Sequence, residues 1–200
     1  MAISKDKFNF KFKYNKSFVL LCADNGYGKT SMLQSFICAG APKDRIYLLN
    51  TSRQHDWSGI IPDSHIYKPL MFNQDFIDQF ILEFAMGKDH SNCLLILDDL
   101  DAFPVKKSDI IYKFVREARH SNIGIVIATG MLQKIPTIYY QMAEYSFFGP
   151  QSNKYNIQYI NKTSITDGYI LSEIERYTFA VWSREEKKMY LVKLDEKFVK

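Results

Sequence analysis

The sequence predicts an α/β fold in which helices cover both faces of a mostly parallel sheet. Short apolar runs typical of buried strands alternate along the chain with longer segments whose apolar residues recur at helical spacing. One of these runs, 18–22, leads through the glycine-containing stretch 23–30 directly into a helical pattern. A strand, a small-residue loop and a helix in this order can bind phosphate. The runs expected to form the core sheet are 18–22, 45–49, 93–97, 123–128 and 144–148.

The length and composition are those of one ordinary globular domain. Of the 200 residues, 46% are hydrophobic and 24% are charged, so we expect a single domain over 1–200. No apolar run approaches the ~20 residues that cross a bilayer, and no secretory signal is visible. The net charge of +4 permits a polyanionic partner without requiring one. The three cysteines are widely spaced, which predicts no metal cluster, no disulfide framework and a reducing, cytosolic setting.

The stretch 23–30 contains the residue types that a P-loop needs. Gly26 and Gly28 let successive backbone N–H groups curl around phosphates, Lys29 can reach the outer phosphates, and Thr30 offers a hydroxyl to Mg²⁺. Alanine replaces the first glycine of the usual pattern. A plain glycine-rich turn is the alternative, which the flanking strand and helix disfavour. The residues expected to bind ATP are Ala23, Asp24, Asn25, Gly26, Tyr27, Gly28, Lys29, Thr30 and Ser31.

Two acids follow the apolar run 93–97. The carboxyl ends of parallel strands form the ligand-binding edge of an open α/β sheet, so Asp98 and Asp99 are expected beside the P-loop. We assign Asp98 to Mg²⁺, opposite Thr30, and Asp99 to the attacking water. Paired acids after a strand can instead cap a helix or form a turn. Their position downstream of a P-loop favours the metal site.

The remaining segments complete the expected architecture. Alternating aromatic and polar residues over 8–14 predict an N-terminal antiparallel strand, half-buried and beside the P-loop strand. Helical spacing of apolar residues predicts helices over 75–86 and 110–118. The polar segment 151–175 is expected to form a small helical lid, and alternating runs predict a C-terminal β-hairpin within 176–197. The sequence has no acidic cluster for a nuclease site, so we expect no nuclease domain.

The order of the segments 23–30, 94–99, 119–129 and 147–150 resembles that of the FtsK/HerA-type viral genome-packaging ATPases, which are P-loop NTPases of the ASCE superfamily. The likeness covers roughly 8–150. It includes the packaging ATPases of membrane-containing viruses and the shorter ones of small podophages. The resemblance implies the core strand order 5-1-4-3-2, with strands numbered along the chain.

The same resemblance implies a function and partners. Proteins of this kind form homo-oligomeric rings, commonly pentamers or hexamers, bind ATP between subunits and drive double-stranded DNA into a procapsid. The contacts with DNA are independent of its sequence, and a portal or procapsid component docks the ring. The implied location is the host cytoplasm, with transient residence on the procapsid.

The resemblance also implies roles for the matching residues. Lys29 and Thr30 would hold the phosphates and Mg²⁺, Asp98 would be the metal acid, and Asp99 would be the catalytic acid. This chain departs from the family at the last position, where glutamate is frequent.

Two further roles, the arginine finger and the phosphate sensor, remain open between alternatives. Arg116 or Arg119 would be an arginine finger that reaches a neighbour's γ-phosphate, and surface arginines on a solvated helix end are the alternative. Thr129 or Gln133 would sense the outer phosphate, although the hydroxyl of Thr129 can instead cap its strand. The family often has Gln or Asn where this chain has Gly130.

Contact with DNA is expected from loops that face a central pore. Lys106 and Lys107 follow the acids directly, and Arg53 follows the second core strand. Packaging a whole genome requires contacts with the phosphate backbone and not with particular bases. A charged, solvated loop is the alternative for all three residues.

Two rival functions deserve comparison with the motor. A small-molecule kinase of this length would need an arginine-rich lid, and 151–175 contains no arginine. A nucleotide-gated assembly switch, or a helicase loader with little turnover, fits the same fold, and Asp99 in place of glutamate favours it. The sequence leaves the number of subunits, the direction of translocation and the docking partner undetermined.

Overall fold

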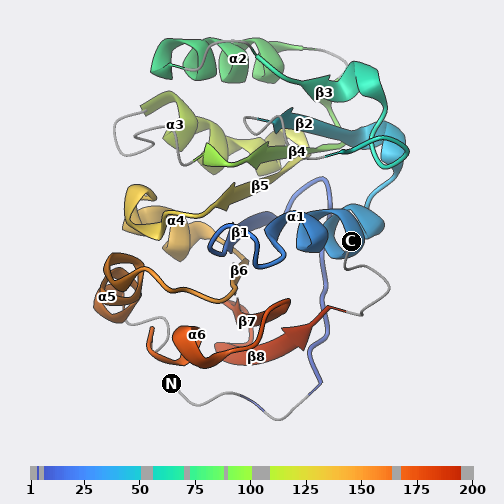
Figure 1. Ribbon diagram of the computed structural model, residues 1–200. Coiled ribbons are helices and arrows are strands. Elements are labelled where there is room, and N and C mark those ends of the chain that lie inside the picture. The colour runs from blue at the N-terminus through green and yellow to red at the C-terminus, as the bar shows by residue number, and fades with distance from the viewer. Residues whose placement is uncertain are drawn as a thin grey trace.

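The computed structural model describes residues 4, 7–50, 56–69, 73–87, 90–100, 109–163 and 168–194. Within these residues a single sheet runs through the centre of the molecule (Figure 1). Its strands are β1 (Phe18–Cys22), β2 (Ile46–Asn50), β3 (Ile66–Tyr67), β4 (Cys93–Asp98), β5 (Ile123–Thr129), β6 (Tyr145–Phe148), β7 (Thr178–Ser183) and β8 (Lys188–Lys193). The eight strands lie in the order β3-β2-β4-β5-β1-β6-β7-β8.

The order confirms the predicted core. The five predicted strands are β1, β2, β4, β5 and β6, and they are neighbours in the order 5-1-4-3-2 when numbered along the chain. All pairs among them are parallel. The short parallel strand β3 extends one edge. On the other edge β7 and β8 form the predicted antiparallel hairpin, and β7 pairs with β6.

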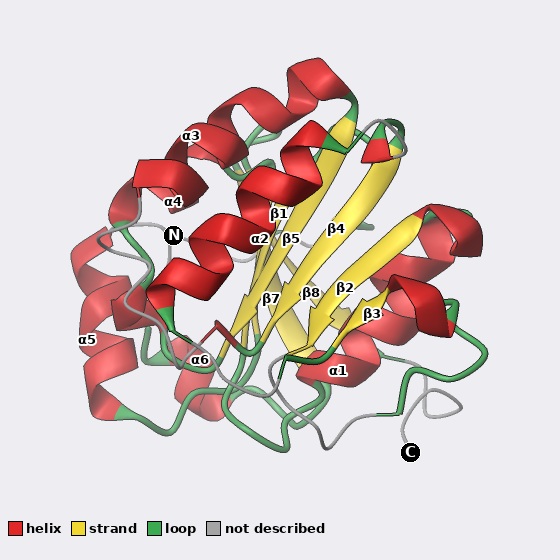
Figure 2. Ribbon diagram, turned by 90° about the horizontal axis from the view of Figure 1, so that it is seen from above, coloured by secondary structure: helices red, strands yellow, loops and turns green. Residues whose placement is uncertain are grey.

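Helices cover both faces of the sheet (Figure 2). They are α1 (Lys29–Met32), α2 (Gln74–Met86), α3 (Asp109–Glu117), α4 (Thr137–Met142), α5 (Lys154–Thr163) and α6 (Ile170–Glu173). The first helix continues as a π-helical turn, Leu33–Ile37, and a 3₁₀ turn, Cys38–Gly40. The carboxamide of Asn73 caps α2, because its Oδ1 accepts the backbone N–H of Phe76 at 2.8 Å.

Side chains that alternate along each strand divide the core into two layers. In β1, Val19 and Leu21 face α1 and pack with Met32 and Leu33, whereas Leu20 and its neighbours on that face pack with α2, α3 and α4. The central strands are buried on both faces, as expected for a parallel sheet between helices. The face of each residue near a strand end is therefore fixed by its position in the strand.

The predicted N-terminal strand is wrong. Residues 7–13 form no strand, because both sides of β1 are occupied by β5 and β6. The aromatic residues of this segment are nevertheless partly buried against the layer that contains α1. Phe10 stacks on Phe36, with ring centroids 4.9 Å apart, and Phe8 packs beside Tyr190. The alternation of aromatic and polar residues thus predicted correctly that one side of the segment is buried, but it did not predict correctly that the segment pairs with β1.

The described part of the segment 151–175 contains the helices α5 and α6, which lie at the lower left of Figure 1. Its role as a lid stays a prediction. No helix within the described part of the chain is long and apolar enough to cross a membrane.

Buried thiols give the fold a specific sensitivity to alkaline pH. Burial raises the pKa of Cys38 from 9.0 to about 12, and the negative charge of Asp98 adds to this effect. Burial also raises the pKa of Cys93 to about 12, although the charge of Arg45 opposes it. Above pH 9 the unfolded chain releases these protons while the folded chain keeps them, so the free energy of unfolding falls as the pH rises toward 12.

We therefore expect the Tm of the wild type to fall more steeply between about pH 8 and about pH 10 than the Tm of a Cys38→Ala/Cys93→Ala variant. Thermal unfolding followed by circular dichroism measures both. Other buried groups that titrate, such as Tyr140, are the same in both proteins. Parallel curves for the two proteins would show that the thiols do not contribute.

Candidate nucleotide-binding site

The P-loop joins the carboxyl end of β1 to α1. Gly26 and Gly28 have φ angles of 81° and 96°, in the left-handed region that glycine adopts without steric cost. The first helical turn begins at Lys29, and Thr30 lies within this turn, half-buried. The loop is thus shaped by the two predicted glycines, and it presents the N-terminus of a helix at the ligand-binding edge of the sheet.

Lys29 is held by the second acid of the predicted pair. Its ammonium Nζ lies 2.7 Å from Oδ1 of Asp99, and the side chains are 6% and 20% exposed. Nζ also lies 3.5 Å from Oδ1 of Asn25. The structure therefore brings together the predicted phosphate-binding lysine and the predicted catalytic acid, from segments 70 residues apart in the chain.

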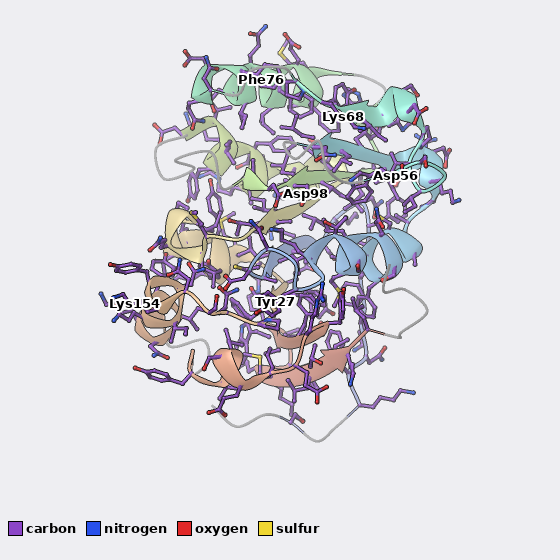
Figure 3. All side chains as sticks on the ribbon, in the orientation of Figure 1. Tyr27, Asp56, Lys68, Phe76, Asp98 and Lys154 are labelled. Carbon is purple, nitrogen blue, oxygen red and sulfur yellow. The ribbon has the colours of Figure 1, made fainter. Side chains whose placement is uncertain are left out.

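Asp98 and Asp99 occupy different environments. Asp98 is the last residue of β4 and is fully buried, on the face of the sheet that packs against α1 (Figure 3). Asp99 leaves the strand with a φ of 54°, in the left-handed region. Aspartate and asparagine adopt this region more readily than longer side chains do. The backbone conformation therefore gives a physical reason for aspartate where the related ATPases often have glutamate.

The start of the P-loop is anchored to the segment after β6. The carboxylate of Asp24 accepts hydrogen bonds from the backbone N–H and the hydroxyl of Ser152, each at 2.6 Å. A Cβ atom at Gly149 would lie 2.6 Å from the Cβ of Ala23. The close approach requires small residues at both positions, which accounts for alanine at the head of the loop.

Thr129 ends β5 beside the P-loop strand, opposite Cys22. Its hydroxyl accepts the backbone N–H of Met131 at 3.0 Å, and the side chain is buried. The Thr129 hydroxyl therefore caps the end of its strand, as the alternative interpretation predicted. A role of Thr129 in sensing phosphate stays a prediction. Gln133 lies in the following 3₁₀ turn and is half-buried.

The hairpin supplies two P-loop contacts that the sequence did not reveal. Nε of Arg176 donates to the carbonyl of Gly26 at 2.8 Å, and the guanidinium lies over the ring of Tyr177, 4.8 Å from its centroid. The Tyr177 ring packs directly on Gly28, where any Cβ atom would collide with it. Tyr177 itself has a φ of 62°, a conformation that costs energy for an aromatic residue. No local pattern signals contacts between residues so far apart in the chain.

We expect Arg176→Ala to weaken the binding of a fluorescent ATP analogue by roughly 3- to 10-fold, because one hydrogen bond that holds the loop is lost. Equilibrium titration measures this change. Arg184→Ala is a matched control, since Arg184 lies in the same hairpin and donates to the carbonyls of Gln141 and Met142, away from the P-loop. Equal losses in the two variants would contradict a specific effect on the loop.

The donor set fits Mg²⁺. Thr30 supplies a hydroxyl and Asp98 a carboxylate, both oxygen ligands of the kind that Mg²⁺ prefers. Within the described residues no group of three or more His, Cys, Asp or Glu side chains could hold a metal ion. A site with so few protein ligands suits Mg²⁺, which usually keeps several waters and binds through phosphate oxygens.

The two candidate arginine fingers lie away from this P-loop. Arg116 ends α3, and Arg119 lies in the 3₁₀ turn Ala118–Ser121 that precedes β5. The P-loop follows the carboxyl end of β1, which is parallel to β5, so both arginines lie at the opposite, amino edge of the sheet. With ~3.3 Å per strand residue, the two edges are roughly 15–20 Å apart. Neither arginine serves the site of its own chain.

The two arginines also differ from each other. Nε of Arg116 is 2.7 Å from the Glu117 carboxylate, which raises the pKa of Arg116 through a hydrogen bond and its charge. Arg119 instead lines a hollow of about 700 Å³ at the amino edge. The other cationic residues that line this hollow are Lys11, Lys13, Lys16 and Arg184, and His120 lines it as well.

The hollow is a predominantly basic surface. Its acidic members are Glu144 and Glu185. Among the described residues, neither Arg119 nor the three lysines of the hollow form a salt bridge. The surface is therefore suited to an anionic partner. The predicted DNA-binding residues Arg53, Lys106 and Lys107 lie outside the described residues.

The fold is shared with proteins of known structure. The chain is similar to the DNA-packaging ATPase B204 of Sulfolobus turreted icosahedral virus, with a TM-score of 0.74 and 15% identity over 90% of this chain and 100% of that chain. It is similar to the genome-packaging NTPase B204 of Sulfolobus turreted icosahedral virus 2 in complex with AMPPCP, with a TM-score of 0.73, 15% identity, and coverage of 90% and 98%.

A conjugation coupling protein is a more distant likeness. TcpA of pCW3, solved with ATPγS, gives a TM-score of 0.63 and 11% identity, over 93% of this chain and 62% of that chain. At such low identity these likenesses show the fold. None of the curated proteins matches the sequence.

A family model establishes the relationship by sequence. The model described as Poxvirus A32 protein matches residues 5–168, which is most of the chain and includes the P-loop, both acids and both arginines. The match confirms the resemblance that the motifs predicted. This chain belongs to the Poxvirus A32 protein family, and its fold is that of the P-loop NTPases.

Proposed function

We propose that this chain is the ATP-driven motor that packages a viral double-stranded DNA genome into a procapsid, acting as a ring of five or six copies. The observation that carries the proposal is the convergence of Lys29, Asp98 and Asp99 beside Thr30 at one edge of the sheet. An NTPase needs this set of groups, and a protein of the same fold, B204 of Sulfolobus turreted icosahedral virus, is a DNA-packaging ATPase. The proposed location is the host cytoplasm, with transient docking on a portal or procapsid component.

In the proposed reaction each residue has a separate task. The P-loop backbone and Lys29 bind the phosphates of ATP, and Asp99 accepts a proton from the attacking water or orients it. Thr30 and Asp98 would hold Mg²⁺, which neutralises charge on the phosphates. Because Lys29 is bonded to Asp99 in this structure, binding of ATP has to exchange a carboxylate for phosphate oxygens at Nζ.

The arginine that completes the site is proposed to come from the next subunit. Arg119 lies at the sheet edge opposite its own P-loop, within the basic hollow. If the ring stacks the amino edge of one copy against the P-loop of another, this guanidinium reaches the neighbour's γ-phosphate. The predominance of positive charge around Arg119 supports such a contact with a nucleotide that carries several negative charges.

Contact with DNA is proposed for Lys106 and Lys107, and next for Arg53. In the sequence these residues follow β4 and β2, whose carboxyl ends border the nucleotide site. Lysine and arginine contacts with phosphates do not depend on base sequence.

A nucleotide-gated assembly switch or helicase loader with low turnover is the second candidate. It is favoured by the direct pairing of Lys29 with Asp99, which occupies both groups. In a switch this pair would open on binding of ATP and would reform only slowly.

Steady-state ATP hydrolysis distinguishes the two. The rate is measured alone, with long duplex DNA, and with duplex DNA and procapsids. The motor predicts stimulation by DNA and further stimulation by procapsids, whereas the switch predicts a low rate that neither changes. Absence of stimulation by either partner would contradict the motor. Electron-microscopy class averages of the protein with an ATP analogue would give the number of subunits.

A further inference from the structure

Asn50 is a fully buried polar residue at the end of β2 whose side chain makes no hydrogen bond to any other described residue. It is 0% exposed, and within the described part of the chain neither Nδ2 nor Oδ1 has a partner. A buried amide without hydrogen-bond partners destabilises the folded chain relative to one that is hydrogen-bonded. Asn156, equally buried, differs in that its Nδ2 donates to the carbonyl of Gly130 and to Oε1 of Gln151, so that only its Oδ1 has no partner among the described residues. The lack of hydrogen-bond partners for the buried amide of Asn50 therefore needs an explanation.

Asn50 lies directly beside the metal acid. In the parallel pairing of β2 with β4 its Cα is in register with that of Asp98. Leu48, two residues earlier, packs in the layer that contains α1, so Asn50 faces the same side. Asp98 faces this side as well, because Ile96 belongs to the same layer. The carboxamide thus projects next to the Asp98 carboxylate, toward the helix whose first turn carries Thr30.

The chemistry of the amide suits this place. A carboxamide both donates and accepts hydrogen bonds, so it can bind a water that a metal ion and a carboxylate also hold. Mg²⁺ in nucleotide sites typically retains several waters. An apolar residue would fill a buried strand end at no polar cost, and the other residues of β2 are aliphatic or aromatic.

We propose that Asn50 is a positioning residue of the nucleotide site, whose carboxamide hydrogen-bonds a water of the metal–phosphate cluster that Asp98 holds. The inference rests on the proposed Mg²⁺-ATP site of this chain, and it adds a residue that lies outside the P-loop and the acid pair.

The test compares Asn50→Leu with the wild type by two measurements that do not require hydrolysis. The first is the Kd for a fluorescent ATP analogue, in the presence of Mg²⁺ and in EDTA. We expect Asn50→Leu to weaken binding by roughly tenfold with Mg²⁺ and to leave it unchanged in EDTA. The second is the Tm without nucleotide, which we expect to be equal or higher, because an unsatisfied polar group has been removed.

Ser146→Ala is the matched control. Ser146 is also 0% exposed, and its hydroxyl has no partner among the described residues. It lies in β6, which is between β1 and β7 and therefore on the other side of β1 from β2 and β4. We expect this variant to keep the wild-type Kd under both conditions. Should the leucine variant fail to fold, Asn50→Ala removes the amide without added bulk and has the same expected effect on binding.

Two results would overturn the inference in different ways. In the first, Mg²⁺ increases the affinity of the wild type and of the Asn50 variants for the analogue by the same factor. Asn50 then has only a structural role in β2, while the proposed nucleotide site is still supported. If the wild type shows no gain from Mg²⁺, the metal site and the inference fail together. Neither result depends on whether DNA stimulates hydrolysis, so the packaging function is tested separately.

Discussion

Asp99→Asn is expected to lower the rate of ATP hydrolysis by about 10²–10³-fold while tightening the binding of ATP several-fold. The carboxylate is the group proposed to act on the attacking water, so its loss slows the chemical step. The same carboxylate binds Lys29 at 2.7 Å in this structure and competes with the phosphates for it. An uncharged amide competes less, and it also removes repulsion between Asp99 and the nucleotide.

Asparagine suits this experiment because it tolerates the left-handed backbone at position 99, where φ is 54°. Lys29→Ala is the opposing control, since it should lose both hydrolysis and affinity. Rates come from phosphate release, and affinities from titration with a fluorescent analogue. Asp99→Glu, which restores the residue frequent in the family, is expected to lower the Tm because of the backbone conformation. A wild-type rate in Asp99→Asn would remove Asp99 from the catalytic step.

Arg119→Ala is expected to lower hydrolysis by about 10³–10⁵-fold in the assembled protein without weakening the binding of ATP to a single chain. The arginine lies at the amino edge of the sheet, away from its own P-loop, so it can act only on a neighbour. Mixing Arg119→Ala chains with inactive Lys29→Ala chains should therefore restore part of the activity. In the mixed ring some sites have an intact P-loop from one chain and an intact arginine from the next.

Arg116→Ala is the matched comparison. Arg116 is exposed on the last turn of α3 and is bonded to Glu117, so we expect a much smaller loss of activity. If Arg116→Ala behaves as described for Arg119→Ala, including recovery in the mixture, the finger is Arg116. If neither mixture recovers activity, no arginine of this helix end acts between subunits.

The core strands and the phosphate-binding loop could be predicted from the sequence alone. The runs that became β1, β2, β4, β5 and β6 are recognisable because strands buried on both faces must be apolar throughout. Gly26, Gly28 and Lys29 are recognisable because a phosphate-binding loop depends on local backbone freedom and on one cation. Both signals are contained in a few consecutive residues.

Which distant residues meet depends on the folded chain. Apolar and polar residues alternate over 8–14 as they do in a strand, but a segment becomes a strand only if the edge of a neighbouring strand is available for hydrogen bonds. Both edges of β1 are already paired, with β5 and β6. The contact of Arg176 with Gly26 spans 150 residues, and the register of Asn50 with Asp98 follows from the pairing of β2 with β4. Such contacts depend on topology, because the chain's crossovers bring strand ends to a common edge.

The same reasoning applies to charge. From the sequence, Arg116 and Arg119 are two arginines near a helix end, and Asp98 and Asp99 are two adjacent acids. The structure distinguishes the members of each pair, since burial and backbone conformation are properties of the folded chain. It places Asp98 in the core, Asp99 against Lys29, and Arg119 in a basic hollow at the far edge of the sheet.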